Sequence, residues 1–385
     1  YTGGEDSVVS QETQMLVRAG HSVRLVERTN DEIKGYSSQQ KRGLFFRTTW
    51  NFNSGNWLSK QIQASRPDIL HVHNFFPLIS PSIHSAAQGL NIPNIQHLHN
   101  FRLGCLNAYF YRNGQVCEAC LGTNPWRGVL YRCYRSSLPA SVGLWQMLTV
   151  HRWRRTWHHD VDAFITPSTF AAQKMIEIGI PEDKLYVKPN AIEDPRQGEN
   201  LPLPEKPVFV FAGRLSPEKG AMVLLRAWCL VKEPEWRLRI VGDGPEKENL
   251  QRFCHEKGLS NVSFEGYVSP SKLMKIIQSS SLLVVPSQWY ETFGRVVIEA
   301  FACGRGAMIS NLGALAELVQ ENVNGCLVES GDTQIWAERI RWTGHHRAAI
   351  ERWGKAARHS YEMSFMPDVN YRRLLKIYTD VAASS

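Results

Sequence analysis

The chain has 385 residues, of which 43% are hydrophobic and 21% are charged, proportions typical of folded globular proteins and a length that favours two domains. No apolar run reaches the roughly 18 to 20 residues that a membrane-spanning helix needs, and no low-complexity tract or short repeat interrupts the sequence. The 44 basic and 36 acidic residues give a net charge of +8, which favours anionic partners such as nucleotides, phosphates or anionic lipid surfaces.

The amino-terminal segment predicts a glycine turn, a helix and a strand. The letters "YTGGEDSVV" begin in a turn that leads into a helix, so we expect a first core strand to precede Tyr1. Apolar residues recur at helical spacing from 7 to 18, and "AGHSVRLVER" at 19–28 predicts a glycine stop followed by a strand.

Three further apolar runs predict buried strands in the first half of the chain. Because helix-forming segments lie between them, they indicate a parallel sheet covered on both faces. His71, His73 and His97 lie in these runs, and we expect them to be ordinary core or surface residues whose hydrogen bonds are satisfied. The runs are "PDILHVHNF" at 67–75, "NIPNIQHLHNF" at 91–101 and "DVDAFITPS" at 160–168.

A proline-rich segment at 190–207 predicts a linker. Strands and helices alternate again after it, and the segment from Thr333 to about Ala382 predicts helix. The chain is therefore predicted to be an α/β protein with two doubly wound domains, which bind ligands in a cleft at the carboxyl ends of their strands. The predicted strands of the second domain are "VFVFAGRL" at 208–215, "WRLRIVGDG" at 236–244, "NVSFEGYV" at 261–268, "SLLVVPS" at 281–287 and "GAMIS" at 306–310.

Two carboxylates stand out in the apolar stretch "SQWYETFGRVVIEAFACG" at 287–304. A helical interpretation places Glu291, Arg295 and Glu299 on one face, because a step of four residues turns only about 40° around a helix. They then form either a solvated stripe with an Arg295–Glu299 pair or a functional pair of carboxylates. The stretch alone leaves both interpretations open.

The stretch "FAGRLSPEKG" at 211–220 predicts an anion site. Ser216 and Pro217 are typical of a helix start, with serine as the cap and proline at the first position. Arg214 and Lys219 flank that start although cations oppose the positive end of a helix. A diphosphate site therefore explains the stretch better than an ordinary capped helix does.

Two other glycine turns precede predicted helices. Gly3 and Gly4 would let backbone amides approach a phosphate closely. Gly242 and Gly244 form a G-x-G motif, but Lys247 stands where a dinucleotide fingerprint needs its third glycine. An NAD or FAD site is therefore disfavoured, and a tight turn from strand to helix is favoured.

Four cysteines lie in a segment inserted after the strand at 91–101. One C-x2-C pair flanked by single cysteines is half of the usual two-pair signature of a structural Zn²⁺ site. The alternatives are free thiols or local disulfides, and thiols are expected in a reducing compartment. The four residues are Cys105, Cys117, Cys120 and Cys133.

Six motifs occur in the order and spacing seen in retaining glycosyltransferases of family 4, and the chain resembles the branch of that family that makes bacterial surface polysaccharides. The resemblance implies the GT-B fold, in which two Rossmann-like domains face each other across a cleft. It covers the whole second domain, and the first half of the chain is also similar. The motifs are "AGRLSPEKG", "VGDGP", "FEGYV", "PSQWYETFGRVVIEAFACG", "SNLGALAELV" and "NGCLVESGD".

The resemblance also implies the domain boundaries. We expect an acceptor-binding domain at 1–195, with the cysteine-containing insertion at about 102–140. A nucleotide-sugar-binding domain follows at 196–365. A C-terminal helix at 366–385 is expected to cross back to the first domain.

The two glutamates correspond to the E-x7-E signature of this family. The resemblance implies that Glu291 faces the donor sugar at a helix amino terminus and that Glu299 holds the ribose hydroxyls. Carboxylates are good acceptors for vicinal hydroxyls, and a buried carboxylate needs such donors. Other implied contacts to the donor are the amides of Thr292, Phe293 and Gly294, the backbone near Tyr267 and Val268, and the loop with Gly3 and Gly4.

The resemblance assigns the remaining catalytic roles to three side chains. Arg214 and Lys219 would neutralise the diphosphate and the charge that develops as it leaves, so we expect neither a catalytic metal nor a cofactor. His99 matches the family's active-site histidine, although Asn100 stands where relatives often have aspartate. Because no nucleophile is evident, we expect a same-face mechanism with retention, in which the leaving phosphate takes the acceptor proton.

The segment "HRWRRTWHH" at 151–159 mixes cations with tryptophans, as interfacial segments do. It is either an exposed basic helix whose tryptophans face the core or a contact with an anionic membrane surface. We favour the membrane contact, because lipid-linked acceptors are common in polysaccharide assembly.

The sequence thus predicts a cytoplasmic hexosyltransferase, peripheral on the inner face of the plasma membrane. It would move a hexosyl unit from a UDP-sugar, such as UDP-glucose, to a saccharide or lipid-linked acceptor, and would bind no nucleic acid. The alternatives are a GT-B nucleotide-sugar epimerase and a non-catalytic nucleotide-sugar binding protein.

Overall fold

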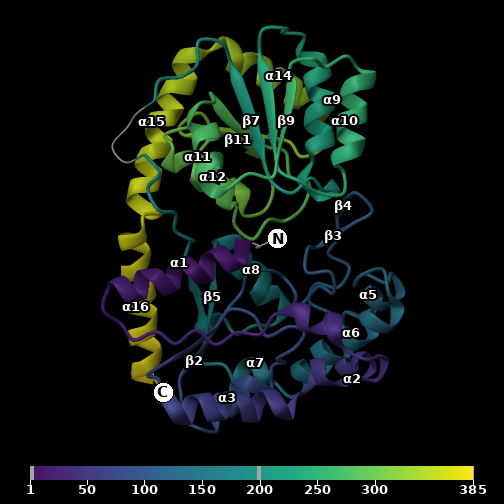
Figure 1. Ribbon diagram of the computed structural model, residues 1–385, viewed down its shortest axis with the longest axis vertical. Coiled ribbons are helices and arrows are strands. Elements are labelled where there is room, and N and C mark those ends of the chain that lie inside the picture. The colour runs from purple at the N-terminus through teal and green to yellow at the C-terminus, as the bar shows by residue number, and fades with distance from the viewer. Residues whose placement is uncertain (1–3, 197–200, 385) are drawn as a thin grey trace. The chain divides into compact units, whose positions relative to one another are not determined.

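The computed structural model describes residues 4–196 and 201–384, which divide into two compact units (Figure 1). The first unit holds the described residues of Tyr1–Phe110, Cys117–Pro189 and Tyr371–Ser385. The second holds Tyr111–Val116 and the described residues of Asn190–Asn370. Each unit has its own sheet and its own core, so each is described separately.

The first unit is built on a parallel sheet in the order β1-β2-β5-β6. The strands predicted at 67–75, 91–101 and 160–168 are confirmed, and β6 was not predicted. The strands are β1 (Leu70–Val72), β2 (Asn94–His97), β5 (Ala163–Thr166) and β6 (Leu185–Val187), and a separate antiparallel pair is formed by β3 (Tyr111–Arg112) and β4 (Gln115–Val116).

Helices surround this sheet, and the end of the chain is one of them. Ile95, Ala163 and Ile165 of the sheet pack in one buried cluster with Leu374 and Ile377 of α16. The helices are α1 (Gly4–Arg18), α2 (Ser38–Thr49), α3 (Phe52–Ser65), α4 (Ser82–Gln88), α5 (Trp126–Leu130), α6 (Leu138–Trp153), α7 (Thr156–His159), α8 (Thr169–Ile178) and α16 (Pro367–Ser384), with short 3-10 turns η1 (Asn30–Gly35) and η2 (Glu182–Lys184).

The strand predicted within 19–28 is wrong. After α1, no strand is assigned to these residues, and most of their side chains are exposed, with Leu25 54% exposed. Alternating apolar residues form a strand only when a neighbouring strand pairs with them. The described sheet has no strand paired with this segment.

The second unit is built on a six-stranded parallel sheet in the order β12-β11-β10-β7-β8-β9. All five predicted strands of this unit are confirmed, whereas β12 was not predicted. The strands are β7 (Val208–Ala212), β8 (Arg237–Val241), β9 (Val262–Gly266), β10 (Leu282–Val285), β11 (Ala307–Ser310) and β12 (Gly325–Val328).

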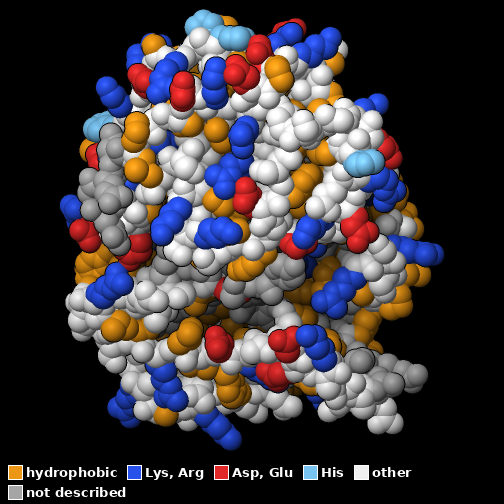
Figure 2. Space-filling view, turned by 45° about the horizontal axis from the view of Figure 1, so that its top comes forward, with side chains coloured by type: hydrophobic (Ala, Val, Ile, Leu, Met, Phe, Trp, Pro, Cys, Tyr) orange, Lys and Arg blue, Asp and Glu red, His pale blue; other side chains and the backbone are white. Residues whose placement is uncertain are grey.

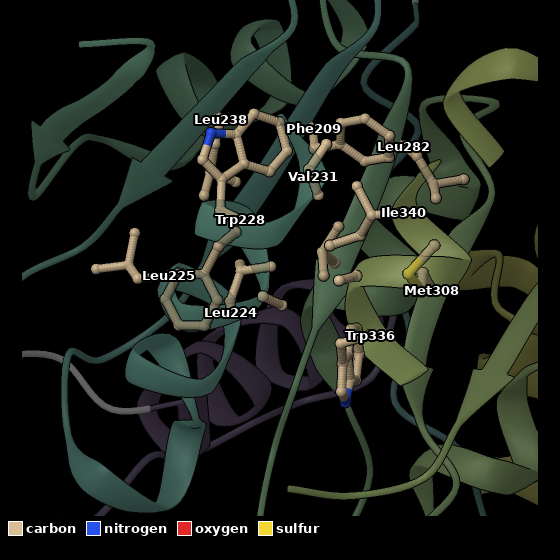
Figure 3. Close-up of a cluster of buried hydrophobic side chains, with 14 of the residues drawn as sticks. Phe209, Leu224, Leu225, Trp228, Val231, Leu238, Leu282, Met308, Trp336 and Ile340 are labelled. Atoms are coloured by element: carbon tan, nitrogen blue, oxygen red, sulfur yellow. The ribbon is translucent and has the colours of Figure 1, made fainter. Parts of the chain in front are cut away.

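Alternation along the strands sends side chains to two cores. Phe209 and Phe211 of β7 lie in a cluster with α9, α10 and α14 (Figure 3), whereas Val210 and Ala212 lie in a second cluster with α11 and α12. Helices therefore cover both faces of the sheet, as the α/β prediction requires. They are η3 (Pro217–Lys219), α9 (Ala221–Val231), α10 (Lys247–Glu256), α11 (Pro270–Gln278), α12 (Arg295–Ala302), α13 (Leu315–Leu318), α14 (Thr333–His345) and α15 (Arg347–Ser364).

The surface carries charges of both signs. Figure 2 shows Lys and Arg side chains spread over the face in view, with Asp and Glu side chains among them. The net charge of +8 is thus not gathered in one patch on that face. Within residues 4–196 and 201–384, no helix has the length and apolar character needed to cross a membrane.

Candidate active site

Two loops at one edge of the second sheet bring the predicted cation and carboxylate together. β7 and β10 are adjacent and parallel, with Phe209 paired to Leu282, so the loops after them leave from the same edge. The amide of Gln288 donates a hydrogen bond of 2.8 Å to the carbonyl of Glu218, which ties one loop to the other. Lys219 and Glu291 lie in these two loops.

Lys219 and Glu291 form the centre of the site. Lys219 Nζ lies 2.6 Å from Glu291 Oε1, and the Ser287 hydroxyl donates to the same oxygen at 2.8 Å. The Lys219 ammonium also lies 5.1 Å from the centre of the Trp289 ring. Burial raises the pKa of the Glu291 carboxyl, but the charge and hydrogen bond of Lys219, together with the hydrogen bonds of Ser287 and Trp289, leave that pKa below its ordinary value. Glu291 is therefore ionised at neutral pH.

Gly220 allows the two loops to approach this closely. Its φ is +73°, and a Cβ at this position would lie 1.9 Å from the carbonyl oxygen of Pro286. A left-handed backbone and this contact together require glycine. Gly220, the residue after Lys219, is thus packed directly against the loop that follows β10.

The start of the helix after β7 differs from the prediction. Pro217 begins the 3-10 turn η3, and α9 begins only at Ala221, after Gly220. The Ser216 hydroxyl caps neither, because it donates to Glu218 Oε1 at 2.5 Å. Arg214 precedes this turn, and its side chain is exposed.

Glu291 and Glu299 do not share one helix. α12 begins at Arg295, after Gly294 with a φ of +114°, so Glu291 lies in the loop before the helix. Thr292, Phe293 and Gly294, predicted to offer amides to the donor, belong to the same loop.

Glu299 is buried on α12, and Arg295 Nε donates to its Oε1 at 3.1 Å. The Arg295–Glu299 pair of the solvated-stripe interpretation therefore exists, but the Glu299 side chain in it is only 11% exposed. Burial raises the pKa of Glu299 and outweighs the lowering effect of Arg295. A solvated stripe is thus the wrong description of this position.

The loops after β8 and β9 complete this sheet edge. A Cβ on Gly242 would lie 1.8 Å from the carbonyl oxygen of Gly213, and one on Gly244 would lie 2.3 Å from that of Leu215. These glycines therefore serve close backbone packing, in agreement with the tight-turn interpretation. Tyr267, 64% exposed, and the half-buried Val268 follow β9.

In the first unit, His99 lies just beyond β2. Its Nε2 is 3.0 Å from Nδ1 of His73, and burial, reinforced by His73, lowers the pKa of His99 to about 3. The Asn100 side chain accepts a hydrogen bond of 3.0 Å from the amide of Arg102. Gly4 is the first residue of α1, whereas Gly3 lies outside the described residues.

The other strand histidines were expected to be satisfied, and this expectation is wrong for two of them. Both ring nitrogens of His97 and Nε2 of His71 are buried without a hydrogen-bond partner. The rings of His71 and His97 are stacked, with their centroids 5.4 Å apart.

The four cysteines of the insertion do not belong to a group of close ligand atoms found among the described residues. Among the described residues, the group of three or more His, Cys, Asp and Glu ligand atoms close enough to share an ion lies at Glu12, His71, His73 and His97 instead. Cys105 is buried, and Cys117, Cys120 and Cys133 are half-buried.

The segment 151–159 covers the end of α6 and all of α7. Trp153 is 81% exposed, whereas Trp157 is 5% exposed and lies in the core. Trp157 thus fits the interpretation in which the tryptophans face the core. Trp153 does not, and its exposed side chain is available to a partner.

Sequence reasoning missed four side chains of these sites. Ser287 and Trp289 lie in the quoted stretch 287–304, and a hydroxyl and an indole so near a carboxylate in an apolar loop were a usable signal. The Lys188 ammonium donates to Glu12 Oε1 at 2.6 Å, and the sequence gave no signal for this contact because the two residues are 176 positions apart.

Comparison with known proteins identifies the class. The model of glycosyl transferases group 1 matches residues 193–360, and the model of glycosyltransferase family 4 matches residues 2–196. Together with the two α/β units and the sheet-edge site, these matches define a glycosyltransferase-type chain with the GT-B fold. The chain belongs to glycosyltransferase family 4.

Similar structures and relatives agree with this class. A glycosyltransferase from Rickettsia africae ESF-5 is 17% identical with a TM-score of 0.71, covering 99% of this chain and 95% of its own. Anabaena HepE, solved with UDP and glucose, is 19% identical with a TM-score of 0.61, covering 84% and 80%. A glycosyltransferase of Methanocaldococcus jannaschii is 34% identical over 173 residues, 40% of this chain and 44% of its own. The chain matches between 31% and 48% of the length of the first curated relatives.

Proposed function

We propose that this protein is a retaining, metal-independent hexosyltransferase. It takes a hexosyl unit from a nucleotide sugar, a UDP-sugar such as UDP-glucose, and passes it to a saccharide or lipid-linked acceptor in the synthesis of a bacterial surface polysaccharide. Membership of glycosyltransferase family 4 supports the reaction class. The ion pair of Lys219 and Glu291 at the sheet edge is the single observation that carries the proposal.

This pair gives the site a cation and an anion with separate tasks. The ammonium of Lys219 has three donors, and one of them is used by Glu291 at 2.6 Å. Its side chain is 24% exposed, so the other donors can meet a diphosphate. Arg214, exposed on the same loop, supplies a second cation. Two cations neutralise the charge that grows as the diphosphate leaves, which is why we propose no catalytic metal and no cofactor.

Glu299 suits the ribose of the nucleotide. One of its oxygens accepts from Arg295, and an ionised carboxylate has about four acceptor positions. Two vicinal hydroxyls would donate to the remaining positions and would offset the cost of burying this charge. We assign the base to the backbone at Tyr267 and Val268.

The sugar end of the donor would contact Glu291 and the amides of Thr292, Phe293 and Gly294. Transfer would proceed on one face of the sugar: the bond to the diphosphate breaks, the acceptor oxygen bonds to the same carbon, and a phosphate oxygen takes the acceptor proton. We assign His99 and the loop with Gly3 and Gly4 to the same reaction, on the resemblance to the family.

UDP is the proposed donor nucleotide because the structurally similar HepE was solved with UDP and glucose. A lipid-linked acceptor would bring the protein to the inner face of the plasma membrane. The segment 151–159 is the proposed contact, since its Trp153 is 81% exposed. Phe52, at the start of α3, is 75% exposed. The Arg154 guanidinium lies 4.5 Å over the Trp50 ring, and the Trp50 ring meets the Phe52 ring edge-on. A cation of the segment 151–159 therefore lies beside these aromatic side chains.

The proposal is tested by following UDP-sugars with the purified protein in the presence and absence of saccharide acceptors. We expect UDP release and a glycosylated product with the configuration of the donor. Glu291→Gln should lower the rate by at least about a hundredfold, the loss typical when a charge that stabilises a transition state is removed. Glu235→Gln is the matched control, because Glu235 pairs with Lys206 at 2.9 Å on the exposed surface of the same unit.

The other outcomes separate the alternatives. Release of an epimerised sugar without any acceptor would replace the transferase by an epimerase. Binding of the UDP-sugar without turnover would leave a binding protein. Equal rates for Glu291→Gln and Glu235→Gln would remove Glu291 from the reaction.

A further inference from the structure

A buried cluster of three histidines and one glutamate lies in the first unit, and the donor chemistry above does not use it as a group. His71 lies on β1, His73 just after it, and His97 ends β2, which pairs with β1 in parallel. Residues two apart on a strand share a face, so the two neighbouring strands bring these imidazoles together. Glu12 of α1 meets them, and one ligand atom from each of the four lies within 4.8 Å of all the others.

The spacing inside the cluster is too wide for hydrogen bonds. Glu12 Oε2 lies 3.6 Å from His73 Nε2 and 3.9 Å from His71 Nδ1, and Glu12 Oε1 lies 4.0 Å from His97 Nδ1. His71 Nδ1 also lies 2.7 Å from the Tyr378 hydroxyl, which leaves Nε2 as the unpartnered nitrogen of His71. Two ligand atoms bound at about 2.0 to 2.1 Å to one tetrahedral ion are separated by about 3.4 Å. The observed distances therefore approach the spacing of ligands around an ion.

Several polar atoms of the cluster are buried and lack a partner. They are Glu12 Oε2, Nε2 of His71, and both ring nitrogens of His97. His97 is 1% exposed and Glu12 is 6% exposed, so bulk water does not satisfy these atoms. Unsatisfied buried polar atoms in a folded protein often mark an ion or water that belongs there.

The ligand set matches a particular metal ion. Three imidazoles and one carboxylate are nitrogen and oxygen ligands that Zn²⁺ accepts in tetrahedral geometry. His73 also has the outer contact that metal-bound histidines usually make, because its Nδ1 lies 3.0 Å from His99 Nε2.

Lys188 opposes a cation in this place. Its ammonium lies 2.6 Å from Glu12 Oε1, and the residue is fully buried. It occupies one oxygen of Glu12 and leaves Oε2 toward the histidines. A positive charge so near a divalent ion weakens binding, so the affinity should rise when that charge is removed.

We propose that Glu12, His71, His73 and His97 form a Zn²⁺ site in the first unit, with Lys188 as a neighbouring charge that moderates its affinity. The four proposed ligands have no assigned role in binding the donor, and the site adjoins the proposed chemistry through the contact of His73 with His99. If His73 binds the ion through Nε2, its Nδ1–H points to His99, and the ion thereby sets the tautomer and orientation of that histidine.

The test is a titration of the full chain, stripped of metal by a chelator, with Zn²⁺ against a chromophoric competitor. Wild type should bind one equivalent. His97→Gln should bind at least about tenfold more weakly, because changes in outer contacts alone cost tenfold to a hundredfold. His359→Gln is the control, since that exposed histidine lies in the second unit. Lys188→Met should bind more tightly than wild type.

Two further measurements test the proposal even if a variant does not fold. Co²⁺ added to the stripped wild type should give the intense visible bands of a four-coordinate ion. UDP binding to the second unit, measured on the same samples, reports separately on the donor site. The proposal is overturned if wild type binds no stoichiometric Zn²⁺ and shows no such Co²⁺ spectrum, or if a folded His97→Gln binds Zn²⁺ as wild type does.

Discussion

The two glutamates of the stretch 287–304 have opposite electrostatic surroundings. Glu291 has the ammonium of Lys219 and the hydroxyl of Ser287 on one oxygen, and its pKa lies below the ordinary value of 4.5. Glu299 is buried on α12 with Arg295 as its partner, and its pKa lies above that value. Ionised Glu291 therefore stabilises the fold, whereas ionised Glu299 destabilises it because its charge is buried.

Exchanging each glutamate for glutamine should reveal this difference in the free energy of unfolding at pH 7. Glu291→Gln should lower it by about 1.5 to 3 kcal/mol, the usual value of hydrogen bonds to a charged group. Glu299→Gln should raise it, because glutamine keeps an acceptor for Arg295 without the buried charge. Urea unfolding between pH 4 and 8 measures both.

The dependence on pH has a definite sign for each position. The depressed pKa of Glu291 contributes stability above about 4.5 that is lost as the pH falls through the folded value. The raised pKa of Glu299 contributes stability below about 4.5 that is lost as the pH rises through the folded value. Both differences from wild type should therefore shrink in acid. If both variants are destabilised equally at pH 7, this account of the two carboxylates is wrong.

The sequence could predict which side chains matter here but not how they meet. The spacing of Glu291 and Glu299 and the cations of "FAGRLSPEKG" were visible in the letters. The continuous helix through Glu291 was a wrong expectation, because Gly294 adopts a φ of +114° and delays the helix to Arg295. The contact of Lys219 with Glu291 spans 72 positions and follows only from the adjacency of β7 and β10.

At the scale of elements, the site depends on how closely the loops after β7 and β10 approach. Gly220→Ala should cost about 2 to 4 kcal/mol of unfolding free energy, because it combines a left-handed backbone with a clash against Pro286. Gly331→Ala is the matched control: its φ is +81°, but a Cβ there meets nothing within 4 Å. The control should cost only about 1 to 2 kcal/mol.

Thermal and urea unfolding of both variants provide the comparison. The larger loss for Gly220→Ala should come with weaker nucleotide binding, because the clash displaces the neighbouring Lys219. Equal losses at the two glycines, with nucleotide binding unchanged, would show that the loop contact does not hold the site.

Most strands could be predicted because buried parallel strands are short apolar runs between turns. All five expected strands of the second unit formed. Residues 19–28 have a similar alternation but no pairing partner in the described sheet. The sequence of one segment alone does not predict whether another strand will pair with it. β6 and β12 were missed, since each is a short run beside polar residues, and their place in the sheet is set by their neighbours.

At the scale of the whole molecule, the class of fold could be predicted from two successive runs of alternating strands and helices. The family motifs then indicated the GT-B fold, which the structural neighbours share. The histidine cluster could not be predicted, because α1, β1 and β2 come together only in the folded unit.

The proposed membrane contact is also a property of the whole protein, since it combines a net charge of +8 with exposed aromatic side chains. Co-sedimentation with vesicles of phosphatidylcholine and phosphatidylglycerol in equal parts should retain the protein at low salt. Binding should weaken as salt shortens the screening length from about 10 Å at 0.1 M to about 3 Å at 1 M.

Trp153→Ser should lower this binding severalfold, whereas Met363→Ser, which changes an apolar side chain 62% exposed in the second unit, should not. Retention of the Trp153 variant at the level of wild type would remove the segment 151–159 from the membrane contact.

The central claim is that the edge of the second sheet binds a nucleoside diphosphate through Lys219 and Glu299. Calorimetric titration of the protein with UDP, GDP and ADP tests it most directly, repeated for Lys219→Ala, Glu299→Ala and the control Glu235→Ala. We predict that UDP binds and that both site variants weaken it by about tenfold or more, a loss of about 1.4 kcal/mol or more, while the control does not. Absence of binding by all three nucleotides, or unchanged UDP affinity in both site variants, would contradict the account.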